Sequence, residues 1–439
     1  MPPPPLSATA VLPPDLEASL RGRLSPGAAV RGSVVSVADA ADVVATVRLA
    51  GRHGVAVAGG GDGADAARGL VVDVDGLGEL SVSEAGWARV GGGVRWRQLA
   101  AAAARHGLAP VPGTSGDERV ADAVTGGGVG LLARTYGPAS DRVRAVELVT
   151  GDGVLRRAAP DEEPELFWGV RGGGAALGLV TAVEVDLLAA GPRYAGDLSW
   201  PGDDAGQVLE EWRTWSAALP PQAGTSLVLV RLPTGEVAVS VRFGWTGDPG
   251  DGAAVLDGLR ARLRPARDDV GVRGPADLGG GVGPVTGVES SLLLDRLGAA
   301  GAGPVLRAAT GGCAPRTVEL RLLGGAVGWV PERSSALCHR DARLAVRVVG
   351  GTGTEDRAAT WACAEELAAA LDPETGGREP AHGHGRWPDV LARTPTPPVR
   401  DRLTALATAT DPHRILEGAG RGRPPVPGPG TGGRPVRGG

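Results

Sequence analysis

Glycine clusters at the ends of apolar runs are the feature of this sequence that most constrains its fold. The first lies in VAVAGGGDG, from Val55 to Gly63, and the second in TGGGVG, from Thr125 to Gly130. A third, VRGGGAALG, begins at Val170. Glycine takes dihedral angles that other residues avoid and lets the backbone approach a neighbour closely. The clusters therefore predict loops bent around a ligand or another chain segment, although a chain with 73 glycines also contains many ordinary turns.

The length and charge of the chain limit its class. Its 439 residues, 42% of them hydrophobic, exceed what one core usually holds, so we expect two domains. The formal net charge is −5 and there is no basic run, which excludes a nucleic-acid surface. The chain contains neither lysine nor asparagine, and the absence of lysine excludes Schiff-base catalysis by that residue. We expect a small-molecule substrate as the partner.

The cysteine spacing and the N-terminal sequence argue against stabilising metals, disulfides and membrane anchors. Cys313, Cys338 and Cys363 are widely spaced and odd in number, so we expect buried free thiols. His382 and His384 lack a third ligand nearby and are expected to face solvent rather than a metal. The N-terminal residues lack the pattern of a signal peptide, and no apolar run is long enough to span a membrane. The expected location is the cytoplasm.

The distribution of helical and strand patterns predicts an α+β chain with a change of texture near Arg193. Short strands and helices alternate before that point, and longer alternating strands with covering helices follow it, which is typical of an antiparallel sheet. The expected division is an N-terminal segment 1–30, a first domain 31–192, a second domain 193–387, a return to the first domain over 388–419 and a disordered tail 420–439.

The order of several motifs resembles that of a known family. VAVAGGGDG is followed by VGGGVRW, PGT, TGGGVGLLARTYG, RAVELVTGDG, LFWGVRGGG and LGLVT, and matching elements continue as far as Leu416. This order is similar to that of the vanillyl-alcohol-oxidase superfamily, specifically its berberine-bridge-enzyme-like oxidases. The resemblance implies a two-domain, PCMH-type FAD-binding fold with an antiparallel-sheet substrate domain. It also implies an FAD-dependent oxidoreductase acting on a small organic substrate such as a secondary metabolite.

The same resemblance assigns the cofactor-binding positions. In the family a histidine after the first glycine loop and a cysteine before the second are bonded covalently to the flavin. Asp62 and Ser115 stand at these positions and cannot form either bond, so any FAD is bound non-covalently. The residues expected to hold it are Gly59, Gly60, Gly61, Asp62, Gly63, Thr114, Ser115, Gly126, Gly127, Gly128, Gly137, Leu179 and Val180.

Charged side chains replace small residues in the segment GDERVADAV, which approaches the FAD diphosphate in the family. Glu118 and Asp122 would repel phosphates at such a short distance, whereas Arg119 could pair with them. The family's tyrosine and asparagine near the flavin correspond to Glu379 and Ala381, so the residue that takes the substrate proton is not identified. These departures favour an alternative, a flavin-free descendant that is a non-redox catalyst such as a cyclase, or a binding protein.

The candidate catalytic residues are Asp62, Glu319 and Arg321. Asp62 is either a solvated turn residue or a carboxylate whose pKa is raised by burial beside the flavin site. Glu319 and Arg321 are two residues apart on an expected strand and therefore share one face of the sheet. They are either a structural ion pair or a pair of substrate contacts.

Overall fold

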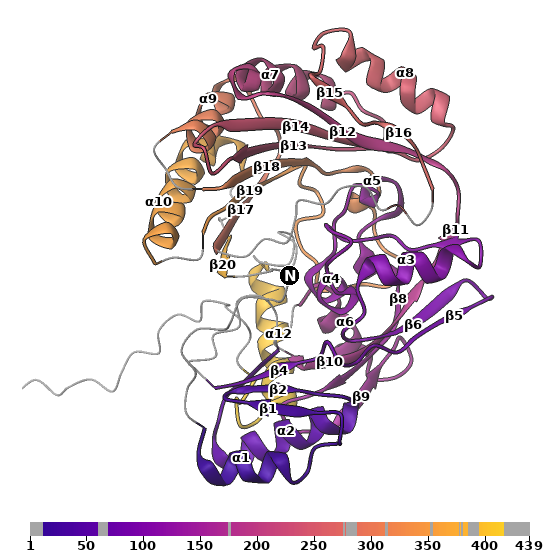
Figure 1. The fold of residues 1–439 in the computed structure, drawn as a ribbon, viewed down its shortest axis with the longest axis vertical. Helices are drawn as coiled ribbons and strands as arrows, with labels where there is room; N and C mark the ends of the chain where they lie inside the picture. The colour runs from indigo at the N-terminus through magenta and orange to yellow at the C-terminus, as the bar shows by residue number, and fades with distance from the viewer. Residues whose placement is uncertain are drawn as a thin grey trace, which may run out of the picture.

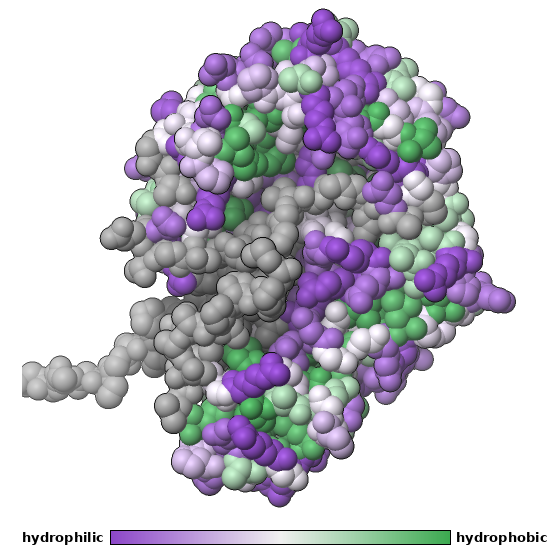
Figure 2. All heavy atoms as spheres, viewed as in Figure 1, coloured by the Kyte–Doolittle hydropathy of each residue, from purple (hydrophilic) through white to green (hydrophobic). Residues whose placement is uncertain are grey.

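The computed structural model describes residues 12–59, 69–173, 177–274, 277, 288–311, 315–351, 354–376, 378, 381–384 and 395–416. Figure 1 shows two bodies, with the N-terminal elements in one and a broad sheet backed by helices in the other. The hydrophobic and hydrophilic residues on the viewed face are interspersed over both bodies (Figure 2). The predicted α+β fold with a large antiparallel sheet is confirmed.

The first sheet is small and mixed, with strand order β1-β2-β4-β3. Its strands are β1 (Ala29–Arg31), β2 (Val34–Ser36), β3 (Val57–Gly59) and β4 (Leu70–Asp73), and helices α1 (Pro14–Arg21) and α2 (Ala40–His53) accompany it. Asp39 caps α2, because its side chain accepts a hydrogen bond from Asp42 N–H at 2.9 Å. Gly54 ends the helix with a φ of 64°.

The second sheet is antiparallel, with strand order β5-β6-β10-β8-β9. Its strands are β5 (Leu80–Ser83), β6 (Trp87–Gly91), β8 (Val143–Val149), β9 (Leu155–Ala158) and β10 (Leu179–Asp186); β7 (Leu108–Ala109) and β11 (Leu188–Ala189) form a separate pair. The helices of this region are α3 (Trp96–Ala104), α4 (Val120–Gly126), α5 (Ala133–Tyr136), the 3₁₀ turn η1 (Ala139–Arg142) and α6 (Pro164–Gly173). Strands β8 and β9 are antiparallel neighbours and form a hairpin.

The third sheet has nine strands and every pairing in it is antiparallel. Its order is β15 (Arg267–Asp268), β12 (Arg193–Pro201), β14 (Val237–Trp245), β13 (Ala223–Arg231), β18 (Thr317–Leu322), β19 (Leu344–Val349), β17 (Val288–Leu294) and β20 (Ala381–His384), with β16 (Gly271–Arg273) also beside β12. The connections contain the 3₁₀ turns η3 (Gly202–Asp204), η4 (Gly325–Gly328) and η5 (Asp372–Glu374).

Four helices cover one face of the large sheet: α7 (Ala205–Ser216), α8 (Pro249–Arg260), α9 (Ala299–Thr310) and α10 (Thr354–Leu371) (Figure 1). Alternate strand residues such as Leu227, Leu320 and Val346 are buried in the core shared with these helices. Because side chains alternate between the faces of a strand, the residues between them point to the opposite face. That opposite face lies toward the N-terminal body and carries the polar residues described below.

The last helix returns to the N-terminal body. Helix α12 (Pro397–Thr410) places Leu403 in the core beneath α6. Arg402 stacks over the Trp168 ring at 3.7 Å and pairs with Glu165 at 2.7 Å. Beyond the helix, Val57 N–H of β3 donates to the Ile415 carbonyl at 2.6 Å.

Arg134 of α5 links the N-terminal body to the large sheet. Its buried guanidinium donates to the carbonyls of Ala223 at 2.7 Å, Leu219 at 2.9 Å and Pro220 at 3.2 Å, and also to that of Leu323. Burial, together with the neighbouring positive charge of Arg343, lowers the pKa of Arg134 to about 10. The guanidinium is still charged at neutral pH.

We expect Arg134→Met to lower the free energy of unfolding by about 2 kcal/mol, because several buried carbonyls lose a charged donor. Chemical denaturation measures this change. The matched control is Arg262→Met, which removes an exposed arginine paired with Glu211 and should cost less than about 1 kcal/mol. Equal losses in the two variants would contradict the linking role of Arg134.

Other predictions concern cysteines, metals and membranes. Cys338 and Cys363 are buried free thiols, whereas Cys313 lies outside the described residues. Among the residues that the structure describes, no group of His, Cys, Asp and Glu could hold a metal ion. His382 and His384 lie on β20, and their expected exposure stays a prediction. None of the described helices has the length and apolar character that a membrane crossing requires.

Candidate functional site

The predicted first glycine loop is described only at its beginning. Gly59 ends β3, and a Cβ added there would lie 3.4 Å from Leu179 Cδ2, an ordinary contact. Two of the predicted cofactor residues, Gly59 and Leu179, are therefore neighbours. Gly60, Gly61, Asp62 and Gly63 lie outside the described residues, so their proposed roles stay predictions.

The second glycine cluster packs against other segments of the protein. Gly128 has a φ of 55°, and a Cβ there would lie 2.7 Å from Ala139 Cβ. A Cβ on Gly130 would lie 2.3 Å from the Gly113 carbonyl oxygen. Gly137, which follows α5, has a φ of 83°. Contacts within the protein thus explain why glycine is needed at these positions, whether or not a ligand is also bound.

The carboxylate of Glu118 turns back onto the loop that contains Thr114 and Ser115. Glu118 Oε2 accepts hydrogen bonds from Thr114 N–H at 3.0 Å and from Thr114 Oγ1 at 3.3 Å. A Cβ on Gly113 would lie only 2.4 Å from the same oxygen. The Ser115 hydroxyl accepts from Asp117 N–H at 3.2 Å. The Glu118 carboxylate therefore already accepts the hydrogen bond from the Thr114 N–H, which the loop would otherwise offer to an anion.

The neighbouring charges of the segment GDERVADAV form ion pairs within the protein. Arg119 is 7% exposed and lies 3.1 Å from Asp122 and 3.5 Å from Asp75. Asp117 pairs with Arg97 at the surface. Arg119 thus already has carboxylate partners, and its predicted contact with phosphates would compete with them.

These observations test whether the loop fits the diphosphate of FAD. Its glycine and Thr114 supply a backbone N–H of the kind that binds phosphates. The same donor holds the Glu118 carboxylate, so a diphosphate would have to displace that side chain. The loop therefore fits the cofactor on the condition that Glu118 moves away from Thr114.

A row of buried polar residues crosses the open face of the large sheet. In the strand register Arg242 of β14 and Arg321 of β18 both lie opposite Ser226 of β13, and Arg347 of β19 lies opposite Glu319. Directly opposed residues of antiparallel strands share a face. The side chains of Arg242, Ser226, Glu319 and Arg321 are each at most 7% exposed. They form a buried polar cluster on the sheet face that lies toward the N-terminal body.

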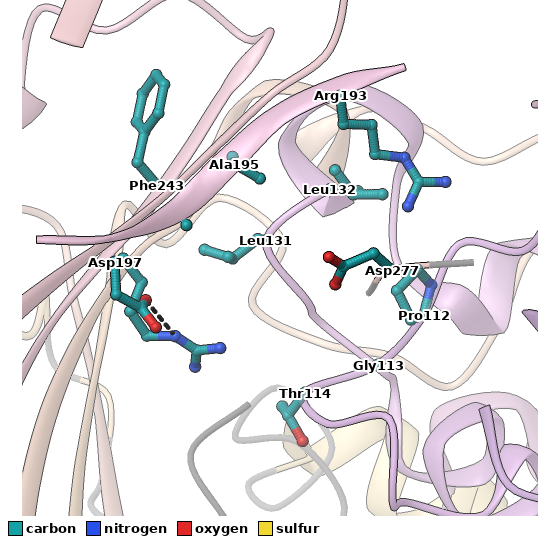
Figure 3. A pocket seen from close by; sticks show the side chains of 13 residues that line it. Pro112, Gly113, Thr114, Leu131, Leu132, Arg193, Ala195, Asp197, Phe243 and Asp277 are labelled. Atoms are coloured by element: carbon teal, nitrogen blue, oxygen red, sulfur yellow. Dashed lines mark ion pairs between the residues drawn. The ribbon is translucent and has the colours of Figure 1, made fainter. Parts of the chain in front are cut away.

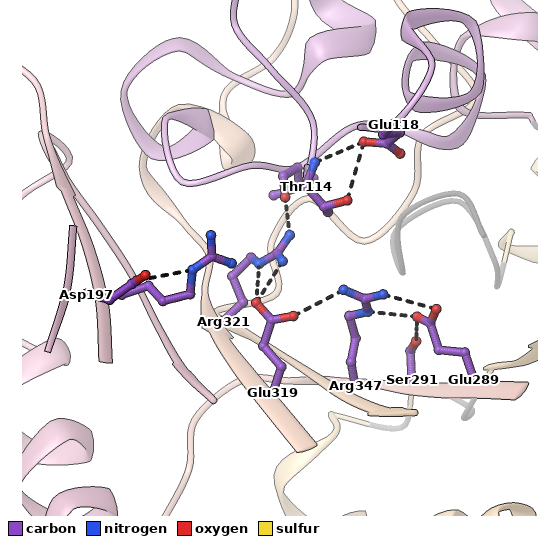
Figure 4. Close-up of polar contacts among 10 residues, drawn as sticks. Thr114, Glu118, Asp197, Glu289, Ser291, Glu319, Arg321 and Arg347 are labelled. Carbon is purple, nitrogen blue, oxygen red and sulfur yellow. Dashed lines mark hydrogen bonds and ion pairs between the residues drawn. The ribbon is translucent and has the colours of Figure 1, made fainter. Parts of the chain in front are cut away.

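Glu319 is the centre of an ion-pair network that Figure 4 shows. Its Oε1 accepts from Arg321 at 2.8 Å and its Oε2 accepts from Arg347 at 3.1 Å. Arg347 also donates to Glu289 at 2.8 and 3.1 Å, and Arg321 donates to the Val129 carbonyl of the second glycine cluster. The structure therefore brings the predicted pair into contact with that cluster.

The charge of Glu319 is strongly stabilised. Burial alone would raise the pKa of this carboxyl, but the guanidinium groups of Arg321, Arg347 and Arg242 lower it to about 2. Glu319 is therefore ionised at neutral pH and has little tendency to accept a proton. This favours the interpretation of Glu319 and Arg321 as an ion pair that shapes the site over one in which Glu319 is a general base.

A pocket opens between this sheet face and the N-terminal body (Figure 3). Arg193, Asp197 and Arg242 bring charges to it, and Asp277 adds another. The remaining wall is mostly apolar or glycine and includes Thr114 of the Glu118 loop. The residues that line it are Pro112, Gly113, Thr114, Leu131, Leu132, Arg193, Ala195, Gly196, Asp197, Arg242, Phe243, Gly244 and Asp277.

Sequence reasoning missed several members of this site, namely Asp197, Arg242, Glu289, Ser291 and Arg347. The alternation that places Glu319 and Arg321 on one face also occurs for Glu289 and Ser291 of β17, and it is the sequence signal that points to them. Arg242 and Arg347 are the single charged residues of two apolar strands. An isolated charge on a buried strand indicates a functional or ion-paired residue, and this is the signal that points to both arginines.

Comparison with known proteins finds similarity to an FAD binding domain and to FAD-linked oxidoreductases. Residues 32–159 match the family model described as FAD binding domain. The chain is 39% identical over 170 residues to (R)-6-hydroxynicotine oxidase of Paenarthrobacter nicotinovorans, an alignment that covers 37% of each chain. It is 32% identical over 168 residues to the FAD-linked oxidoreductase pgmH of Aspergillus terreus, over 37% of this chain and 34% of that protein. The chain thus spans about a third of the length of these curated relatives.

Solved structures match over almost the whole fold. The 6-hydroxy-D-nicotine oxidase of Arthrobacter nicotinovorans superposes with a TM-score of 0.73 at 24% identity, covering 90% of this chain and 92% of that one. The structure of wild-type Physcomitrella patens BBE-like 1 gives a TM-score of 0.74 at 17% identity, covering 93% of this chain and 99% of that one. At these identities the likeness shows the fold. Residues 32–159 are thus similar to the FAD binding domain family, and the fold of the chain is that of the 6-hydroxy-D-nicotine oxidase and BBE-like structures.

Proposed function

We propose that the protein is an oxidase that binds FAD non-covalently and oxidises a small organic molecule, such as a secondary metabolite. The observation that carries this proposal is the match of residues 32–159 to the FAD binding domain. Asp62 and Ser115 at the two attachment positions support non-covalent binding, because neither side chain makes the bonds found in the family.

When bound, FAD would accept a hydride from the substrate and pass the electrons to oxygen. The residues proposed to hold it are the glycine loop that begins at Gly59, the Thr114–Ser115 loop and the Leu179–Val180 segment. Arg321 and Glu319 would set the charge of the sheet face on which the substrate lies. Asp62 is proposed as an acid or base at the cofactor.

The alternative, a flavin-free catalyst or binding protein, is favoured by one observation. The Glu118 carboxylate holds the Thr114 amide that a diphosphate would use. While this hydrogen bond is made, the Thr114 N–H is closed to anions. The pocket on the sheet face would then bind its ligand without a flavin.

We expect the purified protein to bind added FAD and to unfold at a higher temperature when it does, since a ligand that binds only the folded state stabilises it. Riboflavin, which lacks the diphosphate and adenosine, is the matched control and should stabilise less. Acid precipitation should release all of the yellow colour into the supernatant, because no covalent bond retains it. A protein that stays colourless and gains no stability from excess FAD would refute the oxidase and leave the flavin-free alternative.

A further inference from the structure

Arg242 is a buried cation whose partners in the protein are incomplete. Its side chain is 7% exposed and lies 3.5 Å from Asp197, through Nε. Its two Nη atoms donate no hydrogen bond that the structure records to any described residue. Neither Nη atom is among the fully buried side-chain atoms that lack a partner, so this end of the guanidinium faces the space of the pocket, where an acceptor can reach its N–H groups. The Nη end of the Arg242 side chain lines the pocket and has no acceptor among the residues that the structure describes.

A second polar group beside Arg242 also lacks a partner. Ser226 Oγ is fully buried and has no hydrogen-bond partner among the described residues. Ser226 lies directly opposite both Arg242 and Arg321 in the register, so its hydroxyl shares the sheet face with two guanidinium groups. Of these three residues only Arg242 is among those that line the pocket, and Arg321 already donates to Glu319 and to the Val129 carbonyl.

The charges around the pocket select the kind of acceptor that fits. Asp197 and Glu319 attract the charge on Arg242, whereas Arg321 repels it. Across the pocket Arg193 adds a second positive charge, and Asp277 lies near it. The carboxylates of Asp197 and Asp277 would repel a group with two negative charges and so disfavour its binding. A single negative charge with two oxygens matches the free end of one guanidinium.

We propose that this pocket binds the carboxylate of a small organic monoanion, with Arg242 as its hydrogen-bonding partner and Arg193 as a second positive charge. The apolar walls, which include Leu131, Leu132 and Phe243, would contact the rest of the molecule. The proposal deepens the proposed function by naming its substrate class, and it concerns binding alone.

Benzoate and benzamide test it, because they differ in charge but hardly in shape. Titration calorimetry on the full chain without added FAD should show benzoate binding at least tenfold more tightly than benzamide. Arg242→Gln should remove this preference and leave benzamide binding unchanged. The control Arg262→Gln, on the exposed surface beyond α8, should keep the preference.

Two further variants keep the test decisive if Arg242→Gln does not fold. Arg193→Gln should reduce benzoate binding about threefold to tenfold, because it removes the more distant charge. Arg242→Lys keeps the charge but loses the fork, and should retain only part of the preference.

Equal binding of benzoate and benzamide by the unaltered protein would overturn the proposal. So would tighter binding of inorganic phosphate than of benzoate. Because FAD is absent from these titrations, failure of the oxidase proposal in the FAD experiment leaves their outcome unaffected.

Discussion

Glu319→Gln is expected to lower the free energy of unfolding by about 3 to 5 kcal/mol, the cost of breaking a buried ion pair by removing one partner. The side chain is 1% exposed and balances the charges of Arg321 and Arg347. Glutamine keeps the shape but leaves the buried Arg321 and the partly buried Arg347 without the negative charge that they share, although Arg347 keeps its pair with Glu289. Denaturant titration measures the loss.

The same residue predicts a specific dependence of stability on pH. The pKa of Glu319 falls from an ordinary 4.5 to about 2 in the folded protein. A lowered pKa stabilises the fold above the unfolded value, and this contribution is lost as the pH falls from 4.5 toward 2. The contribution is about 3 kcal/mol, by the conversion of one pKa unit to about 1.4 kcal/mol. Glu319→Gln should lack this part of the acid-induced loss.

Glu210→Gln is the matched control for both measurements. Glu210 forms an ion pair with Arg213 on the exposed side of α7, so its removal should cost less than about 1 kcal/mol. Its variant should keep the same decline of stability below pH 4.5 as the unaltered protein. If Glu319→Gln behaves like Glu210→Gln, the network does not stabilise the sheet face as described.

Glu118→Gln is expected to increase the affinity for FAD by tenfold to a hundredfold. The carboxylate now accepts the Thr114 N–H, and its charge would lie close to the diphosphate that the proposed function places there. Two unit charges about 5 Å apart repel by about 3 kcal/mol at an effective dielectric constant of 20. Glutamine removes the charge at little steric cost; its amide oxygen can still accept the Thr114 N–H, so the expected gain comes from the lost charge. Fluorescence titration of FAD measures the change.

Asp117→Asn is the control on the same loop, because the Asp117 carboxylate pairs with Arg97 at the surface and does not hold Thr114. It should change FAD affinity by less than about threefold, as expected for a screened surface charge. An increase confined to Glu118→Gln would support competition between this carboxylate and the diphosphate. Equal effects of both substitutions would indicate a general charge effect, and no effect of either would place the diphosphate elsewhere.

The large sheet illustrates what could be predicted from the sequence. Alternation along a single strand is local, so Glu319 and Arg321 could be placed on one face before the structure was known. Their partner Arg347 could not be identified in the same way, because it comes from another strand whose register depends on contacts between distant segments. The family resemblance supplied the fold of both bodies, but not which charges meet across the strands.

The Thr114 loop shows a different limit. The sequence revealed that Glu118, Arg119 and Asp122 replace small residues, and it left open whether they repel or bind phosphate. Which donor a carboxylate chooses depends on side-chain rotation over a few ångströms, and the hydrogen bond from Thr114 N–H to Glu118 is visible only in the structure. Asp62 lies outside the described residues, so its role stays a prediction.

The contact of Ile415 and Leu416 with β3 has a consequence for synthesis on the ribosome. Val57 N–H is held by the Ile415 carbonyl, and Asp411 accepts hydrogen bonds from Ile415 and Leu416 N–H at 3.0 and 2.8 Å. Ile415 also fills the core of the first sheet. The first sheet is therefore complete only after Ile415 and Leu416 have been translated, although its own strands are translated first. A nascent chain that stops before α12 leaves this edge of the sheet unpaired, and an unpaired strand edge can pair with other chains.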